Sequence, residues 1–324
     1  MSSHTIRFSV VIPLYNKATT IEETLSSVLS QSIEDYEVVI VDDGSTDGSA
    51  QIVAEISDPR VRLIRQDNAG PSAARNRGVA LACGFWIALV DADDLWSHDH
   101  LESLAGAALN AGVVLAFSNL RLESRGGKPM IHPAVGSQLV EDYFRFALAH
   151  GGYPASASSV LIRRDHLMTP KLFTEGISSG EDIDAWCRLA CQGPFFYTAR
   201  PTATYRDLPR PQSLASDLAQ KPVFPLFAEH LPGMIRAGEV PPQLIASALR
   251  YANFLLLEYA RQLIDCNENR AARAVLLKRC RAGFDPKRYF KRLLRTWSVG
   301  RTLYRLKAVF SGSDRRLIKP IAQK

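Results

Sequence analysis

Short apolar runs alternate with amphipathic segments along the first part of the chain. Five runs are continuous enough to be strands buried on both faces: 8–15, 36–41, 61–64, 85–90 and 112–117. Apolar residues at helical spacing predict helices between them, at 21–29, 49–56, 72–82 and 98–111. Thr20 and Glu23 fit a capping box at the start of the first helix. This alternation predicts an α/β domain with a mostly parallel sheet covered by helices.

The pattern changes in the second part of the chain. Two further strands and three helical segments are predicted there, at 158–162, 195–198, 182–191, 242–265 and 271–310. The proline-rich stretch 201–225 separates the last strand from the mainly helical sequence and is the best candidate for a boundary. We therefore divide the chain into an α/β domain, residues 1–206, and a mainly helical region, residues 207–324.

Composition excludes several classes of protein. Apolar residues make up 46% of the 324 and charged residues 22%, as in ordinary globular proteins. No apolar run approaches the ~18 residues that a membrane-spanning helix needs. The five cysteines form no CxxC pair. We therefore expect reduced thiols and a cytoplasmic location.

The net charge of +6 conceals a strong asymmetry. Residues 270–324 contain 17 basic and two acidic side chains, a net charge of +15, whereas residues 1–269 contain 22 basic and 31 acidic side chains, a net charge of −9. Aromatic and leucine residues interrupt the basic segment, which suits either a helix on an anionic membrane surface or a helix packed on the first domain. Nucleic-acid binding through this tail is a third hypothesis, although the acidic remainder argues against it.

Acidic residues follow two of the predicted strands. Because parallel strands end at one edge of a sheet, segments 13–16, 42–44 and 91–94 are expected to share that edge. The sequence has no GxGxxG after the first strand and no P-loop, so dinucleotide and P-loop sites lack their main signature. Asp91 and Asp93 can instead bind Mg²⁺ or Mn²⁺, and the alternative is a solvated acidic turn.

Other candidate residues each have an ordinary structural explanation. Asp43 can hydrogen-bond a nucleobase or ribose, or form a turn of the Asx type. Tyr15 can lie against a base or simply pack as an aromatic side chain. Arg75 can meet a phosphate or base, or be a surface arginine on a helix. The functional interpretation of each depends on the others.

Four successive segments resemble the signatures of family 2 glycosyltransferases in order and spacing. They are VIPLYN at 11–16, VIVDDGSTD at 39–47, GPSAARNRG at 70–78 and LVDADDLW at 89–96. The resemblance is strong over about 8–96 and looser to about 206. It implies a GT-A fold, which is a Rossmann-like sheet with a DxD metal site, and inversion at the anomeric carbon of a sugar carried by a nucleoside diphosphate.

The resemblance also assigns roles to residues. The nucleotide-binding positions it implies are Pro13, Tyr15, Asp43, Arg75, Asp91, Ala92 and Asp93. Pro13 and Tyr15 would border the nucleobase, and Asp43 would bond to it. Asp91 and Asp93 would meet the ribose and the metal-bound diphosphate, with Asp93 the main ligand of Mn²⁺ or Mg²⁺.

The segment Gly180-Glu181-Asp182 resembles a later Glu-Asp motif of the family, in which the aspartate is the catalytic base. Asp184 and Arg188 continue this pattern, whereas His98 replaces the usual proline after the DxD motif. Without the resemblance, an aspartate at a helix start is more often a cap. With it, we predict that Asp182 deprotonates the acceptor hydroxyl.

The sequence therefore predicts an inverting glycosyltransferase for surface polysaccharide or glycolipid synthesis, using a UDP-sugar and a saccharide or lipid-linked acceptor. We expect a cytoplasmic protein, with peripheral binding to the inner membrane face through the basic tail as a further hypothesis. The alternatives are an inactive nucleotide-sugar-binding protein of the same fold and a nucleic-acid binder acting through the tail.

Overall fold

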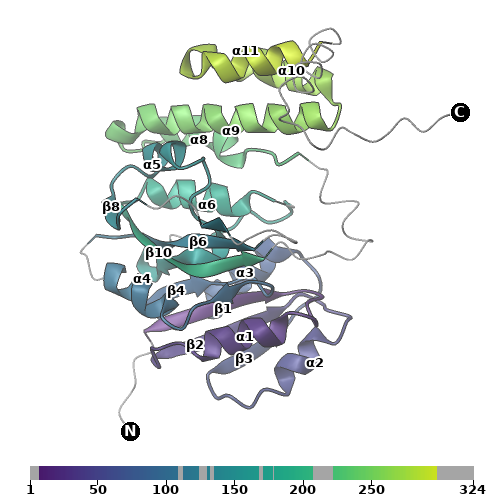
Figure 1. Ribbon diagram of the computed structural model, residues 1–324, viewed down its shortest axis with the longest axis vertical. Coiled ribbons are helices and arrows are strands. Elements are labelled where there is room, and N and C mark those ends of the chain that lie inside the picture. The colour runs from purple at the N-terminus through teal and green to yellow at the C-terminus, as the bar shows by residue number, and fades with distance from the viewer. Residues whose placement is uncertain are drawn as a thin grey trace, which may run out of the picture.

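The computed structural model describes residues 7–108, 112–123, 130–131, 135–167, 171–177, 179–206 and 222–297. Within these ranges the strands form one sheet with helices on both faces (Figure 1). The strands are β1 (Phe8–Leu14), β2 (Tyr36–Asp42), β3 (Val61–Arg65), β4 (Trp86–Leu89), β5 (Leu95–Trp96), β6 (Leu115–Glu123), β7 (Met130–Ile131), β8 (Gln138–Val140), β9 (Val160–Arg163) and β10 (Phe195–Arg206).

The order of strands across the sheet is β3-β2-β1-β4-β9-β6-β10-β5, with β7 beside β6 and β8 beside β10. The pairs β1–β2, β1–β4, β2–β3 and β6–β10 are parallel, which confirms the parallel arrangement predicted for the first strands. Strands β1, β2 and β4 therefore end at one edge, as the sequence predicts. Strand β9 is antiparallel to both β4 and β6 and makes the sheet mixed.

Strand β10 differs from its predicted length. The sequence indicates a strand at 195–198 and a proline-rich boundary from 201, but β10 continues to Arg206 with register shifts around Pro201. The strand accommodates this proline because the pairing with β6 is irregular there. Its far end pairs with the two-residue strand β5, which brings Arg206 beside the acidic turn after β4.

The α-helices of the described residues are α1 (Ile21–Leu29), α2 (Ser49–Ala54), α3 (Pro71–Leu81), α4 (His100–Ala108), α5 (Tyr143–Ala149), α6 (Glu181–Ala190), α8 (Leu226–Arg236), α9 (Ile245–Asp265), α10 (Asn269–Lys278) and α11 (Pro286–Arg295). One apolar core lies between the sheet and helices α1 and α4, which cover one of its faces. The other extends from the opposite face through α3, α5 and α6 to α8 and α9. Figure 1 shows α10 and α11 stacked beyond α9, at the end of the molecule away from β3.

The capping box predicted at the start of α1 is wrong. Thr20 makes no capping hydrogen bond. Its Oγ1 instead donates to the carbonyl of Ala92 at 2.9 Å, and Glu23 pairs with Arg206. Thr20 and Glu23 therefore support the acidic turn after β4 rather than the end of their own helix.

The C-terminal helices also differ from the prediction. The sequence predicts one helix over 271–310, but α10 ends at Lys278 and α11 begins at Pro286, a residue favoured in the first turn of a helix. Positions 298–310 lie outside the described residues, as does 207–221, where the predicted domain boundary falls. Among the described helices, none is long and apolar enough to cross a membrane.

Candidate active site

The ends of β1, β2 and β4 carry the residues that the sequence singled out. Pro13 lies in β1 and is half-buried, whereas Tyr15 follows the strand with 40% of its surface exposed. The loop after β1 is tied to the loop after β2, because Asn16 Oδ1 accepts a hydrogen bond from the backbone N–H of Thr46 at 2.9 Å. Tyr15 is thus an accessible aromatic ring beside two cross-linked loops.

Asp42 and Asp43 are both buried at the end of β2. Asp42 Oδ1 accepts from the N–H of Ser45, three residues further on, at 3.0 Å and so closes the turn after β2. Asp43 Oδ1 accepts from Ala69 N at 2.9 Å, and its Oδ2 accepts from Gly70 N at 2.8 Å. Asp43 therefore fixes the loop that leads into α3, and one lone pair of Oδ2 remains for a ligand.

Asp91 and Asp93 stand on the turn after β4 with Ala92 buried between them. Their side chains are 31% and 26% exposed. Asp93 pairs with the ammonium group of Lys17, and Asp91 Oδ1 accepts from Arg75 Nη2 at 2.6 Å. The two carboxylates thus reach solvent while each faces a cationic side chain.

Asp94 is the buried member of the same turn. It accepts hydrogen bonds from Ser158 Oγ at 2.5 Å and from the N–H of Arg206 at 3.1 Å. Burial, together with the charge of Asp91, raises the pKa of Asp94 to about 8. Since Ser158 also accepts from the N–H of Asp91 at 3.1 Å, this pair holds the backbone that positions the two exposed carboxylates.

Arg75 joins this edge of the sheet to helix α6. The close approach of α3 to β1 depends on Gly78, where an added Cβ would meet Val11 Cγ1 at 2.3 Å. The Arg75 side chain is 7% exposed, and its Nη1 donates to Glu181 Oε1 at 2.7 Å while Nη2 reaches Asp91. The two carboxylates raise the pKa of Arg75 against the opposing effect of its burial. One guanidinium therefore brings the first turn of α6 next to the DxD turn.

Asp182 lies in the first turn of α6, next to Glu181. The capping position belongs to Gly180, whose φ of +87° favours glycine, so Asp182 is not the cap considered from sequence. Asp182 Oδ1 accepts from the N–H of Ile183 at 2.7 Å. Burial and the neighbouring Glu181 carboxylate raise the pKa of Asp182 to about 6, and Arg75 opposes this shift.

Asp184 and Arg188 anchor α6 rather than face the DxD turn. Asp184 is fully buried and accepts from Arg188 Nε at 3.0 Å and from Nδ1 of His230, on α8, at 2.9 Å. Arg188 also donates to the carbonyl of Leu172. These contacts fix the orientation of the helix that carries Asp182.

Sequence reasoning missed two residues that organise this site, Lys17 and Arg206, and gave no role to two others, Asp94 and Glu181. Glu181 and Asp94 adjoin predicted residues, but only their contacts distinguish them from solvated acids. Arg206 donates from Nε to the carbonyl of Asp93 at 2.5 Å and lies in a stretch that was assigned to a boundary. The positive charge of Arg206 was the only sequence feature that could have suggested a contact with the acidic turn after β4, since no local pattern predicts that β10 extends that far.

The oxygen donors at this edge fit a divalent cation. Asp91 and Asp93 supply the hard carboxylate ligands that Mg²⁺ and Mn²⁺ prefer. Among the described residues, no three His, Cys, Asp or Glu side chains gather into a complete metal site. Mg²⁺ commonly binds through one or two carboxylates together with substrate phosphates. The pair therefore suits a cation that binds along with a diphosphate.

Known proteins resemble the chain in sequence. The sequence model described as Glycosyl transferase family 2 matches residues 9–167. The succinoglycan biosynthesis protein ExoO of Rhizobium meliloti is 44% identical over 121 residues, which are 37% of this chain and 35% of ExoO. The Bacillus subtilis protein TuaG, a glycosyltransferase named for teichuronic acid biosynthesis, is 30% identical over 191 residues, 57% of this chain and 72% of TuaG. The chain thus spans about a third of ExoO and most of TuaG.

The fold of this chain resembles that of solved glycosyltransferase structures. Residues 1–349 of S. aureus TarS in complex with UDP-GlcNAc superpose with a TM-score of 0.63 at 19% identity, covering 93% of this chain and 92% of that one. The mannosyltransferase PcManGT of Pyrobaculum calidifontis, in complex with GDP-Man and Mn²⁺, gives a TM-score of 0.57 at 20% identity, covering 95% and 85%. At these identities the likeness concerns the arrangement of the sheet and its helices.

Proposed function

Since this chain belongs to glycosyltransferase family 2, we propose that it transfers a sugar from a nucleoside diphosphate sugar to an acceptor hydroxyl with inversion at the anomeric carbon. The chain is a glycosyltransferase with a GT-A fold, and relatives are named for polysaccharide biosynthesis. The observation that carries the proposal is the contact of Arg75 with both Asp91 and Glu181. It supports a site in which the carboxylates of Asp91 and Asp93 act on the sugar donor while Asp182 acts on the acceptor.

On the donor side, the nucleotide contacts proposed are those of Pro13, Tyr15, Asp43, Arg75, Asp91, Ala92 and Asp93. Tyr15 offers an exposed ring to the base, and Asp43 has one acceptor position left for it. Asp91 and Asp93 would hold Mn²⁺ or Mg²⁺, which when bound stabilises negative charge on the departing diphosphate. A UDP-sugar is the donor we favour, and TarS, which shares the fold, is known with UDP-GlcNAc.

On the acceptor side, Asp182 is the proposed general base. Its pKa of about 6 leaves the carboxyl largely ionised at neutral pH while making it more basic than an ordinary aspartate. Oδ2 has no hydrogen-bond partner within the described part of the chain and can receive the proton of the attacking hydroxyl. Asp184 keeps the helix in place through His230 and Arg188.

Donor binding tests the proposal directly. We expect UDP-sugars, GDP-mannose or dTDP-glucose to raise the melting temperature in the presence of Mn²⁺, because a ligand that binds only the native state stabilises it. Asp93→Asn removes a charged ligand of the cation and weakens binding of the nucleotide sugar at least about tenfold, since a charged contact contributes about 1.5–3 kcal/mol. The control is Asp35→Asn, an exposed aspartate before β2 at the opposite end of that strand.

An unchanged melting temperature with every donor contradicts the proposal. Donor binding without release of nucleoside diphosphate, measured over hours with Mn²⁺, supports the alternative of an inactive nucleotide-sugar-binding protein.

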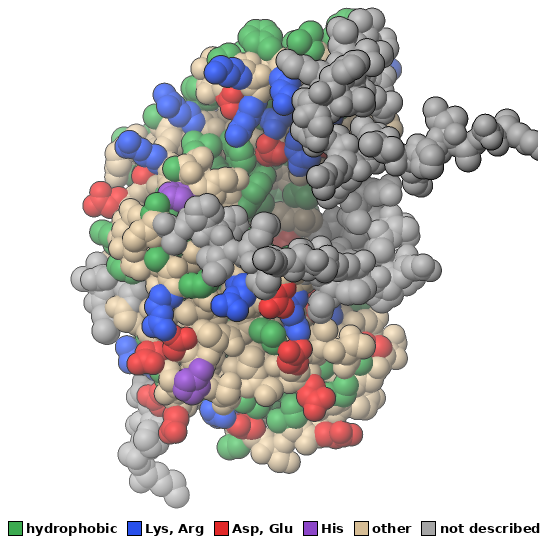
Figure 2. Space-filling model, in the orientation of Figure 1, with side chains coloured by type: hydrophobic (Ala, Val, Ile, Leu, Met, Phe, Trp, Pro, Cys, Tyr) green, Lys and Arg blue, Asp and Glu red, His purple; other side chains and the backbone are tan. Residues whose placement is uncertain are grey.

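A second part of the proposal concerns membranes. The face of α11 turned toward α9 carries Tyr289 and the buried Arg292, which pairs with Glu258. The outer face carries Phe290 and Leu294, which are 55% and 63% exposed. Figure 2 shows hydrophobic and basic side chains together at this end of the molecule. Such a face can bind the headgroup layer of an anionic bilayer.

We expect the protein to float with vesicles containing phosphatidylglycerol at low salt. The double variant Phe290→Glu with Leu294→Glu lowers the bound fraction at least about tenfold. It replaces the apolar surface that membrane binding would bury with negative charges that the anionic surface repels. Leu139→Glu, on the exposed side of β8, is the control. If the double variant binds vesicles as well as Leu139→Glu does, or if the wild type does not bind them, this part of the proposal is contradicted.

A further inference from the structure

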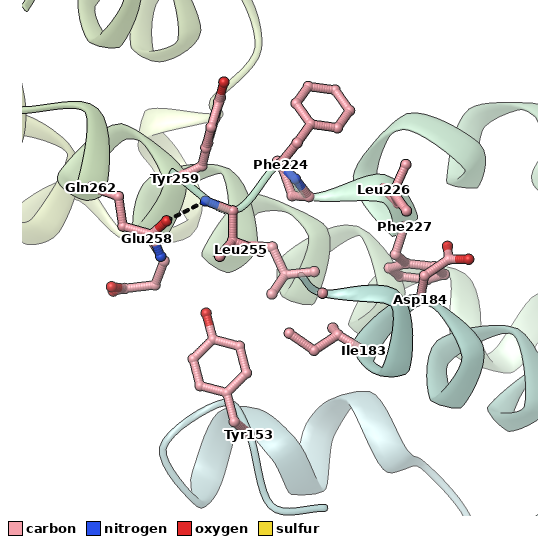
Figure 3. Close-up of a pocket in the computed structure, with 13 residues that line it drawn as sticks. Tyr153, Ile183, Asp184, Phe224, Leu226, Phe227, Leu255, Glu258, Tyr259 and Gln262 are labelled. Carbon is pink, nitrogen blue, oxygen red and sulfur yellow. Dashed lines mark hydrogen bonds between the residues drawn. The ribbon is translucent and has the colours of Figure 1, made fainter. Parts of the chain in front are cut away.

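A hollow lies on the side of α6 that faces the C-terminal helices. It is bounded by the loop carrying Tyr153, the start of α6, the segment 223–227 and one face of α9. Figure 3 shows Tyr153 pointing from its loop toward α9, with Ile183 beside it. This hollow is separate from the edge of the sheet that carries Asp91 and Asp93, none of whose residues line it.

The walls of the hollow combine aromatic rings with unused polar groups. Tyr153 and Phe224 are each 40% exposed, and the Phe224 ring meets Tyr259 edge to face at 5.6 Å. Gln262 Oε1 accepts from the backbone N–H of Val223 at 2.6 Å. Among the described residues, neither Gln262 Nε2 nor the hydroxyl of Tyr153 has a hydrogen-bond partner.

A carboxylate completes the set of polar groups. Glu258 lies on the same wall of α9 and is half-buried. Its carboxylate accepts from Arg261 at 2.8 Å and from Arg292 at 2.5 Å, so it is held in place and stays ionised. Each of its oxygens keeps capacity for a further hydrogen bond.

These groups match the chemistry of a sugar ring. A pyranose has C–H faces that pack against aromatic rings, and hydroxyls that both donate and accept hydrogen bonds. Exposed aromatic rings together with one amide donor, one carboxylate acceptor and one phenol form a small apolar pocket with a few placed polar groups, as ligand sites do. A purely apolar ligand would leave those polar groups without partners.

The hollow adjoins the proposed catalytic base. Gly180 and Ile183 line it and flank Asp182 in sequence. Tyr153 lines the same hollow as these two residues. Asp182 follows Glu181 in the chain, and Arg75 links Glu181 to Asp91 at the edge of the sheet.

We propose that this hollow binds the acceptor saccharide, with Tyr153 as the ring against which the sugar packs and with Glu258 and Gln262 as its hydroxyl partners. The inference rests on the proposed glycosyl transfer and names the place and chemical class of the acceptor. An acceptor held there would lie against the first turn of α6, which carries Asp182.

The test uses methyl glycosides of glucose, galactose, mannose and N-acetylglucosamine as acceptor probes for the full chain. Binding is measured by saturation-transfer NMR, and transfer by product formation with the donor that gave the thermal shift. Tyr153→Ala raises the acceptor KM at least about tenfold and removes the NMR signal, because the packing surface is lost. Tyr153→Phe keeps the ring and has a smaller effect, about threefold, for the loss of one hydrogen bond.

Donor binding separates this inference from the proposed function. The thermal shift produced by the donor stays at the wild-type value in both Tyr153 variants. The control is Phe85→Ala, at an exposed aromatic residue just before β4, which leaves the acceptor KM and the donor thermal shift unchanged. An acceptor KM in Tyr153→Ala equal to that of the wild type overturns the inference while transfer itself stands. Failure of the wild type to bind any donor refutes the proposed function instead.

Discussion

Replacing Asp182 by asparagine lowers the rate of sugar transfer by about 10²–10⁴-fold, the usual contribution of a general base. Asparagine has nearly the same shape, so the hydrogen bond from the N–H of Ile183 persists and the first turn of α6 is retained. Donor binding changes little, because the donor contacts proposed lie on β1, β2, α3 and the turn after β4. The measurement is the rate of product formation at saturating donor, with the donor thermal shift recorded in parallel.

The pH dependence gives an independent measure of the same residue. With a pKa of about 6, Asp182 is protonated below that value and cannot accept a proton, so the rate falls about tenfold per pH unit on the acidic side and levels off above it. The acidic limb disappears in Asp182→Asn. A wild-type profile that is flat between pH 5 and 8 argues that no carboxyl of this kind limits the reaction.

Asp184→Asn is the matched control on the same helix. Asp184 is fully buried between Arg188 and His230, so its replacement lowers the melting temperature by weakening the attachment of α6 to α8. The pH profile of the Asp184→Asn variant keeps its acidic limb, because Asp182 is unchanged. If Asp182→Asn loses donor binding along with transfer, Asp182 supports the donor site and is not the base.

The sequence predicted that segments 13–16, 42–44 and 91–94 share one edge of the sheet, because that placement follows from local pattern. Continuous apolar runs such as 8–15 and 36–41 have the length of strands covered on both faces, and in a parallel sheet the residues that follow them fall on one edge. Strand β5, two residues long, has no such pattern and exists because β10 runs alongside it. The same long-range pairing brings Arg206 to the acidic turn.

The link between the two halves of the site could not be read from pattern. Arg75 and Glu181 are 106 residues apart, and nothing near either one indicates its partner. Resemblance to the family suggested Asp182 as the base, and the structure shows that the adjacent Glu181 is linked to Asp91 through Arg75. Thr20 and Glu23 show the reverse case, in which a valid local motif loses to contacts with Ala92 and Arg206.

Replacing Arg75 by methionine destabilises the fold by about 3 kcal/mol, because it leaves the carboxylates of Asp91 and Glu181 without their common cation. The value is at the lower end for a buried pair, since the Asp91 side chain is 31% exposed and water screens it. Transfer is lost as well, because the first turn of α6 is no longer held beside the DxD turn. Urea unfolding measures the loss of stability, and the rate of product formation at saturating donor measures the loss of transfer.

Two further variants show that this loss comes from the bridge. Arg77→Met removes an exposed arginine two residues away on α3 and changes the free energy of unfolding by less than about 0.5 kcal/mol. The double variant Arg75→Met with Glu181→Gln recovers part of the stability, because one of the two unpaired carboxylates is gone, but it does not recover transfer. Equal unfolding free energies for Arg75→Met and Arg77→Met would mean that the guanidinium does not join the donor edge to α6, and the proximity of Asp182 to Asp91 would then need another cause.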